Sequence, residues 1–412
     1  MADVVSNMNE MHKKVYSKRP MPKVIPEIAK LQKLIPFSEK EKLGDKYVVG
    51  VRLAYPNGFT HAKGDGTAGA FALNDVKGGT QKKAEMDAYQ ILLRDHMSYE
   101  DAGKAVRGER SFVNGTEFFY EGLQLSARKR LETCLLYGQS GIGKVGVYTA
   151  ANAAYGNDAT IQIPLADWGP QIFAGIEGAE LDVMTAATAV VRGTITLKGV
   201  DIETRTLILE APLAGTAAND VLYFKGAYGK EIQGLFSIMS NTGNLFGINA
   251  AQYSLWKGNS VNVAGQFSFA KLKKGLSLAV AKGLFGRIDL FLNPGAWDDL
   301  QTSIEATRQT SDKDVKKVDI GMEEIVYHSQ SGTTHIHSHP MIKEAHGFGL
   351  FTPTWKRVGA VDLSLGAPGF NGAPWFNLPN NAGVEARIYT NQGIMTETPA
   401  QNILFTGIVN SV

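Results

Sequence analysis

The sequence predicts an α+β protein made of several structural units, and three features support this prediction. One long amphipathic helix is expected over residues 114–138, short alternating strands crowd the chain after it, and a basic stretch rich in proline comes before it. A chain of 412 residues is also too long for one simple core. We therefore expect the helix to act as a strut on which the other units pack.

The expected helix has a start signal and a stop signal. Asn114 suits the N-cap position, Glu117 follows three residues later, and Gly138 suits the left-handed residue that closes a helix. Two faces are apolar, so two packing partners are expected, although an ordinary core helix has the same periodicity. The broad face contains Phe119, Tyr120, Leu123, Ala127, Leu131, Cys134 and Leu135, and the narrower one contains Phe118, Leu125 and Leu136.

Composition excludes several classes of protein. The net charge of +2 gives no overall attraction to nucleic acid or membrane, and no apolar run approaches the length of a membrane span. The N-terminus is polar, so we expect no secretory signal. Cys134 is the only cysteine, which rules out an internal disulfide and fits a reducing cytosol. Its place on a buried face argues against a catalytic thiol.

The region before the helix is expected to lie on another surface. Residues 1–45 resemble an arm, because lysines dominate positions 13–33 and prolines interrupt any helix. Residues 46–97 are predicted as a long hairpin, in which a first strand ends at the turn signal Asn57-Gly58 and glycines follow up to residue 79. The return run, residues 84–94, fits a strand or a helix equally well. A hairpin this long has no core of its own and needs a neighbour.

After the long helix the chain alternates between strands and helices. Three short alternating runs within residues 191–228 predict a small antiparallel insertion. Residues 266–285 form a second amphipathic helix with lysines on its outer face, and a buried strand at 287–293 leads into a helix that starts at Pro294. The last runs, residues 384–390 and 402–409, are predicted strands.

One glycine-rich segment resembles a phosphate-binding loop. Gly138, Gly143 and Lys144 match the spacing of that motif, in which backbone amides and a lysine hold phosphates. Val145 stands where a magnesium-binding Ser or Thr is required, and the segment follows a helix where the motif requires a strand. We therefore expect no cofactor and no nucleotide site here.

Three alternating histidines are the second candidate. On a strand, His335, His337 and His339 would share one face, and imidazoles on one surface are a common beginning for a zinc or iron site. A carboxylate or cysteine ligand is missing from the motif, although Glu344 is near in sequence. A solvent-facing strand explains the pattern without a metal, so we expect no metal ligand, and a metal-dependent hydrolase is kept only as an alternative.

No catalytic centre is predicted elsewhere. Asp298 and Asp299 are adjacent on a helix and point about 100° apart, so they cannot readily share a proton. Their place in the first turn is explained by the helix dipole. No catalytic triad order and no dinucleotide fingerprint is present. We therefore expect a protein that is not an enzyme.

The order of the elements, more than any single motif, identifies a family. The stretches that carry the likeness are KYVVGVRLAYPNGFTHA, ARKRLETCLLYGQSGIGKV, GLFSIMSNTGNLFGI, RIDLFLNPGAWDDL and VEARIYTNQGIMTETPAQNILFTGIV. Together they resemble the major capsid protein of tailed bacteriophages with the Hong Kong 97 fold, over nearly the whole chain. One departure is the absence of a long acidic helical segment ahead of the arm, which implies a separate scaffolding protein.

The resemblance implies a shell protein that assembles into hexamers and pentamers around double-stranded DNA, with portal and decoration proteins as further partners and no membrane. The virion, assembled in the host cytoplasm, is the implied location. An encapsulin-like nanocompartment shell and a phage protein outside the shell are the alternatives. The implied units are the arm (1–45), the extended loop (46–97), a peripheral domain (98–190) with the spine helix (115–137), an insertion (191–228), an axial domain with its connections (229–380) and C-terminal strands that return to the peripheral domain (381–412).

The same resemblance assigns residues to two kinds of contact. Charged side chains of the arm and residues around the loop tip are expected between subunits, and lysines on the outer face of the second amphipathic helix are expected to face packaged DNA. A solvated helix face and a plain polar tip are the simpler alternatives. The intersubunit set is Lys13, Lys14, Lys18, Arg19, Asn57, Gly58, Phe59, Lys63 and Lys77, and the DNA-facing set is Lys271, Lys273 and Lys274.

Overall fold

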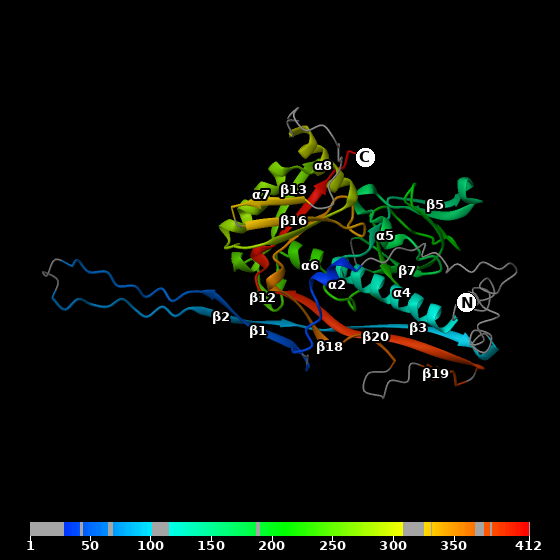
Figure 1. The fold of residues 1–412 in the computed structure, drawn as a ribbon, viewed down its shortest axis with the longest axis horizontal. Coiled ribbons are helices and arrows are strands. Elements are labelled where there is room, and N and C mark those ends of the chain that lie inside the picture. The colour runs from blue at the N-terminus through cyan, green and yellow to red at the C-terminus, as the bar shows by residue number, and fades with distance from the viewer. Residues whose placement is uncertain are drawn as a thin grey trace, which may run out of the picture.

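A long helix, α4 (Gly115–Tyr137), lies at the centre of the fold (Figure 1). The computed structural model describes residues 29–41, 44–64, 69–100, 115–186, 190–307, 325–330, 332–366, 375–379 and 381–411. The predicted helix is confirmed, while its expected N-cap, Asn114, lies outside the described residues. Its broad apolar face is buried, and Leu131 and Leu135 are fully inaccessible. The helix is about 35 Å long at 1.5 Å per residue.

The N-terminal half of α4 packs on a four-stranded sheet. β20 (Gly383–Thr396) pairs antiparallel with β3 (Tyr89–Ser98) on one side, and with β18 (Trp355–Leu365) and β19 (Trp375–Asn377) on the other. Phe119 and Leu123 of the helix meet Met97 of β3 in a small core, and Trp375 stacks on Phe119 with ring centroids 5.6 Å apart. This sheet covers the N-terminal half of the broad apolar face of the helix.

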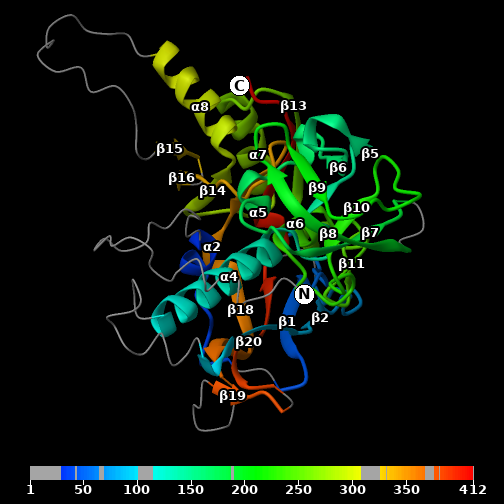
Figure 2. The ribbon, with the colours of Figure 1, turned by 90° about the vertical axis from the view of Figure 1, so that its right-hand side faces the viewer.

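The C-terminal half of α4 enters the main core beside a seven-stranded sheet. Figure 2 shows this sheet on one side of the helix, with α8 above both. The strands in spatial order are β4 (Gly143–Lys144), β10 (Val221–Phe224), β7 (Glu180–Met184), β8 (Val191–Asp201), β9 (Thr206–Leu209), β6 (Asp158–Gln162) and β5 (Val147–Asn152).

The predicted insertion at residues 191–228 is not a separate sheet. Its strands are β8, β9 and β10, and each pairs with a strand from residues 143–184 as well as within the predicted range. The alternating pattern identified the strands correctly. Their partners are distant in sequence, so the pattern could not show that the sheet crosses the predicted boundary at residue 190.

A six-stranded sheet and two helices form a second core. The helices are α7 (Phe269–Ala281), which confirms the second amphipathic helix, and α8 (Pro294–Thr307). Leu272 and Leu276 of α7 are buried against this sheet. The strands in spatial order are β13 (Asn259–Gly265), β21 (Ile403–Ile408), β17 (Gly347–Leu350), β14 (Ile288–Leu292), β16 (Gly332–Ser338) and β15 (Ile325–Ser329).

The two C-terminal strands belong to different sheets. β20 lies beneath α4 in the four-stranded sheet, next to the spine helix to which it was predicted to return. β21 instead runs parallel to β13 in the six-stranded sheet. The expectation that residues 381–412 return together to one domain is therefore wrong for the last strand. The short helical turn at Pro399–Gln401 separates the two strands and redirects the chain.

The extended loop is a two-stranded hairpin that projects from the body (Figure 1). β1 (Tyr47–Ala54) pairs antiparallel with β2 (Thr80–Met86). Residues 84–94 therefore do not form one return strand: β2 ends at Met86, and β3 leaves the hairpin to pair with β20. The chain changes sheet at Asp87 and Ala88.

The predicted arm, residues 1–45, includes a segment that belongs to the core. We call residues 29–41 the strap. It contains α2 (Lys30–Leu34), whose Leu31 is fully inaccessible, and Ile35, which is 2% exposed. Phe37 forms a parallel bridge with Arg357 of β18. The expectation of an arm outside any core is therefore wrong for the strap. Its basic composition gave no indication that Leu31 and Ile35 would be buried.

Short elements complete the described fold, and no described helix is long and apolar enough to cross a membrane. The remaining helices are α5 (Pro170–Phe173) and α6 (Leu235–Ser240), and the remaining strands are β11 (Asn244–Leu245) and β12 (Ile248–Asn249); the single helical turns are Ala153–Tyr155, Leu165–Asp167, Ser254–Trp256 and Thr352–Thr354.

Candidate functional site

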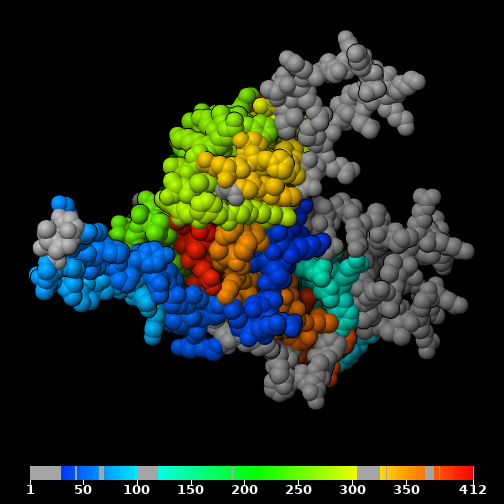
Figure 3. All heavy atoms as spheres, turned by 60° about the vertical axis from the view of Figure 1, so that its left-hand side comes forward, coloured from blue at the N-terminus to red at the C-terminus, as the bar shows by residue number. Residues whose placement is uncertain are grey.

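The hairpin tip, described at residues 55–64 and 69–79, exposes apolar side chains. Val76 is 94% exposed and Leu73 is 78% exposed. Phe59 and Phe71 are also largely exposed, and the space-filling view shows the hairpin projecting from the body of the molecule (Figure 3). A soluble protein rarely leaves so much apolar surface on a projection that nothing covers. The tip is therefore a candidate contact surface.

The two arms of the tip are joined only at a few described positions. The Asn57 N–H donates to the Lys77 carbonyl at 3.0 Å, and the Asn74 N–H donates to the Thr60 hydroxyl at 2.8 Å. The Asn74 side chain also donates to the carbonyl of Phe59. No described residue of the tip belongs to a strand. The described part of the tip is therefore irregular in conformation.

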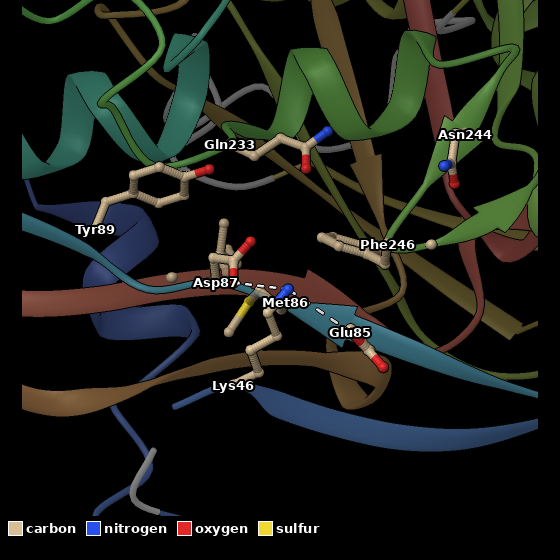
Figure 4. Close-up of a pocket in the computed structure, with 11 residues that line it drawn as sticks. Lys46, Glu85, Met86, Asp87, Tyr89, Gln233, Asn244 and Phe246 are labelled. Carbon is tan, nitrogen blue, oxygen red and sulfur yellow. Dashed lines mark ion pairs between the residues drawn. The ribbon is translucent and has the colours of Figure 1, made fainter. Parts of the chain in front are cut away.

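The hairpin base is fixed to the body beside a pocket of about 290 Å³. The Glu85 N–H donates to the Phe246 carbonyl at 2.9 Å, and Met86 is buried. Lys46 bridges Glu85 at 3.8 Å and Asp87 at 3.4 Å, all half-exposed, so these ion pairs add little stability. Figure 4 shows the three charged side chains on one wall of the pocket and Gln233 and Tyr89 on the other.

Lys356 of β18 joins the strap to the hairpin. Its ammonium group lies 3.1 Å from Glu41 of the strap and 3.0 Å from Glu397. The Tyr47 hydroxyl at the start of β1 donates to Glu41 at 2.7 Å. The hydrogen bonds that Lys356 donates to Glu397 and Glu41 raise its pKa, and the hydrogen bond that Tyr47 donates lowers the pKa of Glu41. The root of the hairpin is thus held by charged groups from several segments.

Glu132 of α4 is the anchor of the strap. Its carboxylate is fully buried and accepts the backbone N–H of Leu31 at 2.6 Å and that of Gln32 at 3.3 Å. The Gln32 side chain donates to the same carboxylate at 2.9 Å, and His339 lies 3.1 Å from it. A buried charge with this set of donors is well satisfied.

The histidine strand is only partly as predicted. His335 and His337 lie on one face of β16, with ring centroids 6.5 Å apart. His339 lies beyond the strand end at Ser338 and points into the core toward Glu132, so the prediction of one shared face is wrong for it. The strand ends before Pro340, which redirects the third histidine. Among the described residues, no three His, Cys, Asp or Glu side chains form a group suited to a metal.

His337 is instead part of an acid–base cluster on β14. It lies 3.5 Å from Asp289, which also accepts hydrogen bonds from Arg287 and from Thr352. Burial alone would raise the pKa of Asp289, but the hydrogen bonds from His337, Thr352 and Arg287 outweigh it and lower that pKa to about 2. This arrangement joins β14 to its neighbour β16 and to the turn at Thr352–Thr354.

The loop at residues 138–145 does not form a phosphate cradle. Its amides are already used: Gly138 donates to Cys134, Ile142 to Leu222 and Val145 to Asp220, each at 2.8–2.9 Å. The segment continues into β4, and no helix follows to orient further amides. Lys144 lies 3.6 Å from Asp167.

A buried polar cluster closes the end of α4 next to this loop. Lys343 is 3% exposed, donates to the Gly141 carbonyl at 3.1 Å and lies 4.6 Å from the Tyr137 ring centroid. Burial lowers the pKa of Lys343 to about 8, partly opposed by Asp167. Burial, with Lys343 and Lys144 nearby, lowers the pKa of His346 to about 3. His346 is therefore neutral at physiological pH.

The remaining predicted residues fall in several environments. Lys273 and Lys274 are exposed on α7, and Lys271 is half-buried there. Asn57, Gly58, Lys63 and Lys77 are exposed in the hairpin tip with Phe59. Cys134 is 3% exposed, and burial raises the pKa of its thiol. Lys13, Lys14, Lys18 and Arg19 lie outside the described residues.

Sequence reasoning missed Glu132, His339 as its partner, and Lys356. The available signal for Glu132 was a carboxylate between two buried positions of an amphipathic helix, Leu131 and Thr133. No comparable signal exists for Lys356, because its partners are distant in the chain.

Comparison with known structures identifies the fold. A capsid chain of cyanophage A-1(L) matches over 96% of this chain and 97% of its own length, with a TM-score of 0.56 and 10% sequence identity. The capsid of Myoviridae phage XM1 matches with a TM-score of 0.48 and 6% identity over 96% of both chains. An encapsulin complex from Synechococcus elongatus matches with a TM-score of 0.44 and 7% identity over 100% of this chain and 97% of its own.

No protein-family model matches the sequence, and no curated protein does. The likeness to the cyanophage chain spans both proteins almost from end to end, so the expected Hong Kong 97-type fold is confirmed.

Proposed function

We propose that this chain, which has the Hong Kong 97-type fold, is the major capsid protein of a tailed bacteriophage. Copies assemble as hexamers and pentamers into an icosahedral shell around double-stranded DNA. The observation that carries the proposal is the end-to-end likeness to the cyanophage capsid chain. The protein is then a structural component of the virion that assembles in the host cytoplasm.

The hairpin supports this proposal independently of the likeness. Its tip exposes Phe59, Phe71, Leu73 and Val76, while its base is held by Met86 and by the groups around Lys356. A rigid root with an uncovered apolar tip suits a contact with another copy. In a closed shell, a contact of modest free energy is repeated at each subunit, so that the contacts together hold the shell firmly. The intersubunit role of residues 57–59 and of Lys63 and Lys77 is part of the proposal.

Further partners follow from the same proposal. A separate scaffolding protein, a portal and decoration proteins complete the particle. Lys271, Lys273 and Lys274 on α7 are proposed to meet packaged DNA through charge alone.

The test is assembly of the purified chain. Electron microscopy should show closed shells or capsomers, and light scattering should give masses far above 44.5 kDa. A monomer at all concentrations would contradict the proposal. Shells that enclose host protein in place of DNA during infection would favour the nanocompartment alternative.

A further inference from the structure

Asn57 and Gly58 are adjacent in the hairpin tip, and an asparagine followed by glycine is a reactive pair. The main-chain nitrogen of the glycine can attack the asparagine side chain, because no Cβ atom shields it and the two groups are held close together. Asn-Gly also occurs at 114–115 and 371–372. The pair at 57–58 is the one that lies wholly within the described residues, and both of its members are exposed and outside any strand.

The two groups that would react are free of other bonds. In the part of the chain that the structure describes, no hydrogen bond involves the Asn57 carboxamide or the Gly58 N–H. The Asn57 N–H, which takes no part in the reaction, donates to the Lys77 carbonyl at 3.0 Å. A Cβ atom at position 58 would lie 3.1 Å from the Asp75 carbonyl oxygen, so the opposing arm also favours glycine there.

Asn74 is a comparison within the same tip, because it is exposed as Asn57 is but is held in place. Its side-chain amide donates to the Phe59 carbonyl at 2.8 Å, and its main-chain N–H donates to the Thr60 hydroxyl at 2.8 Å. The residue that follows it is Asp75, whose side chain hinders attack by the main-chain nitrogen. The tip thus contains one bonded asparagine and one free asparagine.

We propose that Asn57 is a self-modification site, at which the asparagine converts spontaneously to aspartate and isoaspartate. The Gly58 nitrogen attacks Cγ of Asn57 and forms a bond to it, which closes a cyclic succinimide. The bond from Cγ to the side-chain nitrogen breaks, and ammonia leaves with the proton of the Gly58 N–H. A water molecule from the solvent then adds to one of the two ring carbonyls and breaks its bond to the ring nitrogen. Addition at Cγ gives aspartate, and addition at the main-chain carbonyl gives isoaspartate.

The reaction changes the tip in two ways. The new carboxylate is ionised at neutral pH, so the tip gains one negative charge on the arm that faces Lys77. Isoaspartate also lengthens the main chain by one methylene group after the Cα atom. The bond between the Asn57 N–H and the Lys77 carbonyl is one of the few that join the two arms of the tip. We therefore expect the isoaspartate form to have a looser tip.

Peptide mass spectrometry of the purified chain, incubated in mildly alkaline buffer, tests the site. Lys63 places Asn57 and Asn74 on different tryptic peptides, so each is followed separately. The peptide with Asn57 should convert progressively to aspartate and isoaspartate, which electron-transfer fragmentation distinguishes, while the peptide with Asn74 stays intact. The control variant Gly58→Ala keeps the asparagine and adds a Cβ atom beside the attacking nitrogen, and it should slow the conversion several-fold.

A synthetic peptide of residues 53–63 measures the same reaction without the fold. If Asn57 stays intact in the folded chain while this peptide is converted, the tip protects the pair and the inference is overturned. Equal conversion of Asn57 and Asn74 in the folded chain would also overturn it, because a free asparagine and a bonded one would then react alike.

Assembly gives a second readout, which rests on the proposed function. In a sample aged before assembly, isoaspartate at position 57 should be depleted in the particles and enriched in the subunits left over. Equal fractions in the two pools would contradict the expected loosening of the tip. The two proposals fail in different ways, because a wild type without particles refutes the shell function while the mass spectra still decide whether Asn57 is modified.

Discussion

The Nε2 atom of His339 lies 3.1 Å from the Oε1 atom of Glu132, and both side chains are fully buried. The Met341 N–H donates to Nδ1 of the same ring at 3.2 Å. Nδ1 is therefore an acceptor, so the ring proton lies on Nε2, and His339 donates to Glu132 as a neutral imidazole. The Glu132 carboxylate thus accepts hydrogen bonds from the strap and from the loop that follows β16.

Glu132→Gln should lower the free energy of unfolding by about 3 kcal/mol. The side-chain NH2 group of the glutamine would face the N–H donors of Leu31, Gln32 and His339, which now bind the carboxylate of Glu132. Denaturant unfolding of the soluble subunit measures the loss. Gln124→Ala, an exposed change on the same helix, is the control and should be neutral. An unchanged unfolding midpoint for Glu132→Gln would show that the strap does not depend on this anchor.

The stability of the subunit should depend on pH through His346. Its pKa is about 3 when folded, against an ordinary value of 6.5, so between these values the unfolded chain binds a proton that the folded chain does not. The free energy of unfolding should therefore fall as the pH falls from 6.5 toward 3. His346→Phe keeps a ring against Phe236, 4.6 Å away, and should flatten this part of the profile.

The matched control for the pH profile is His61→Gln in the exposed tip, which should retain the full dependence. If the free energy of unfolding of His346→Phe falls with pH as steeply as that of the wild type, a group other than His346 causes the pH dependence.

Lys144→Ala should leave assembly nearly unchanged, and the wild type should show no saturable ATP binding. The amides of the neighbouring loop already serve the fold, and Val145 cannot bind magnesium. Titration of fluorescent ATP checks the second point. Micromolar ATP binding by the wild type that disappears in Lys144→Ala would show that this loop is a nucleotide site.

Replacing residues 57–79 by a short Gly-Ser turn should leave a soluble subunit that melts as before and makes no particles. The described residues of the replaced part belong to none of the buried clusters, whereas the base keeps Ala84 and Met86. Calorimetry and light scattering measure the two properties. A matched variant with Phe59, Leu73 and Val76 changed to Ser keeps the loop length and should also fail to assemble. Normal particles from both variants would mean that the tip makes no contact between subunits that assembly requires.

The sequence was sufficient for elements with a strong local pattern. The apolar periodicity of α4 predicted the helix, and the lysine pattern of α7 marked its outer face. The expectation of one partner for each face of α4 was wrong, because the broad face contacts both cores, through Leu123 in one and Leu131 in the other. The pairing of β3 with β20 joins residues almost 300 positions apart, and no local pattern encodes such a contact. The strap was missed for the same reason, since the burial of Leu31 depends on Glu132 in a different element.

Electron microscopy of the purified protein, together with its mass in solution, measures whether many copies of this chain form a closed shell. We expect closed particles or capsomers of uniform size at micromolar concentration. A monodisperse 44.5 kDa monomer that forms no larger species at any concentration or ionic strength would contradict it.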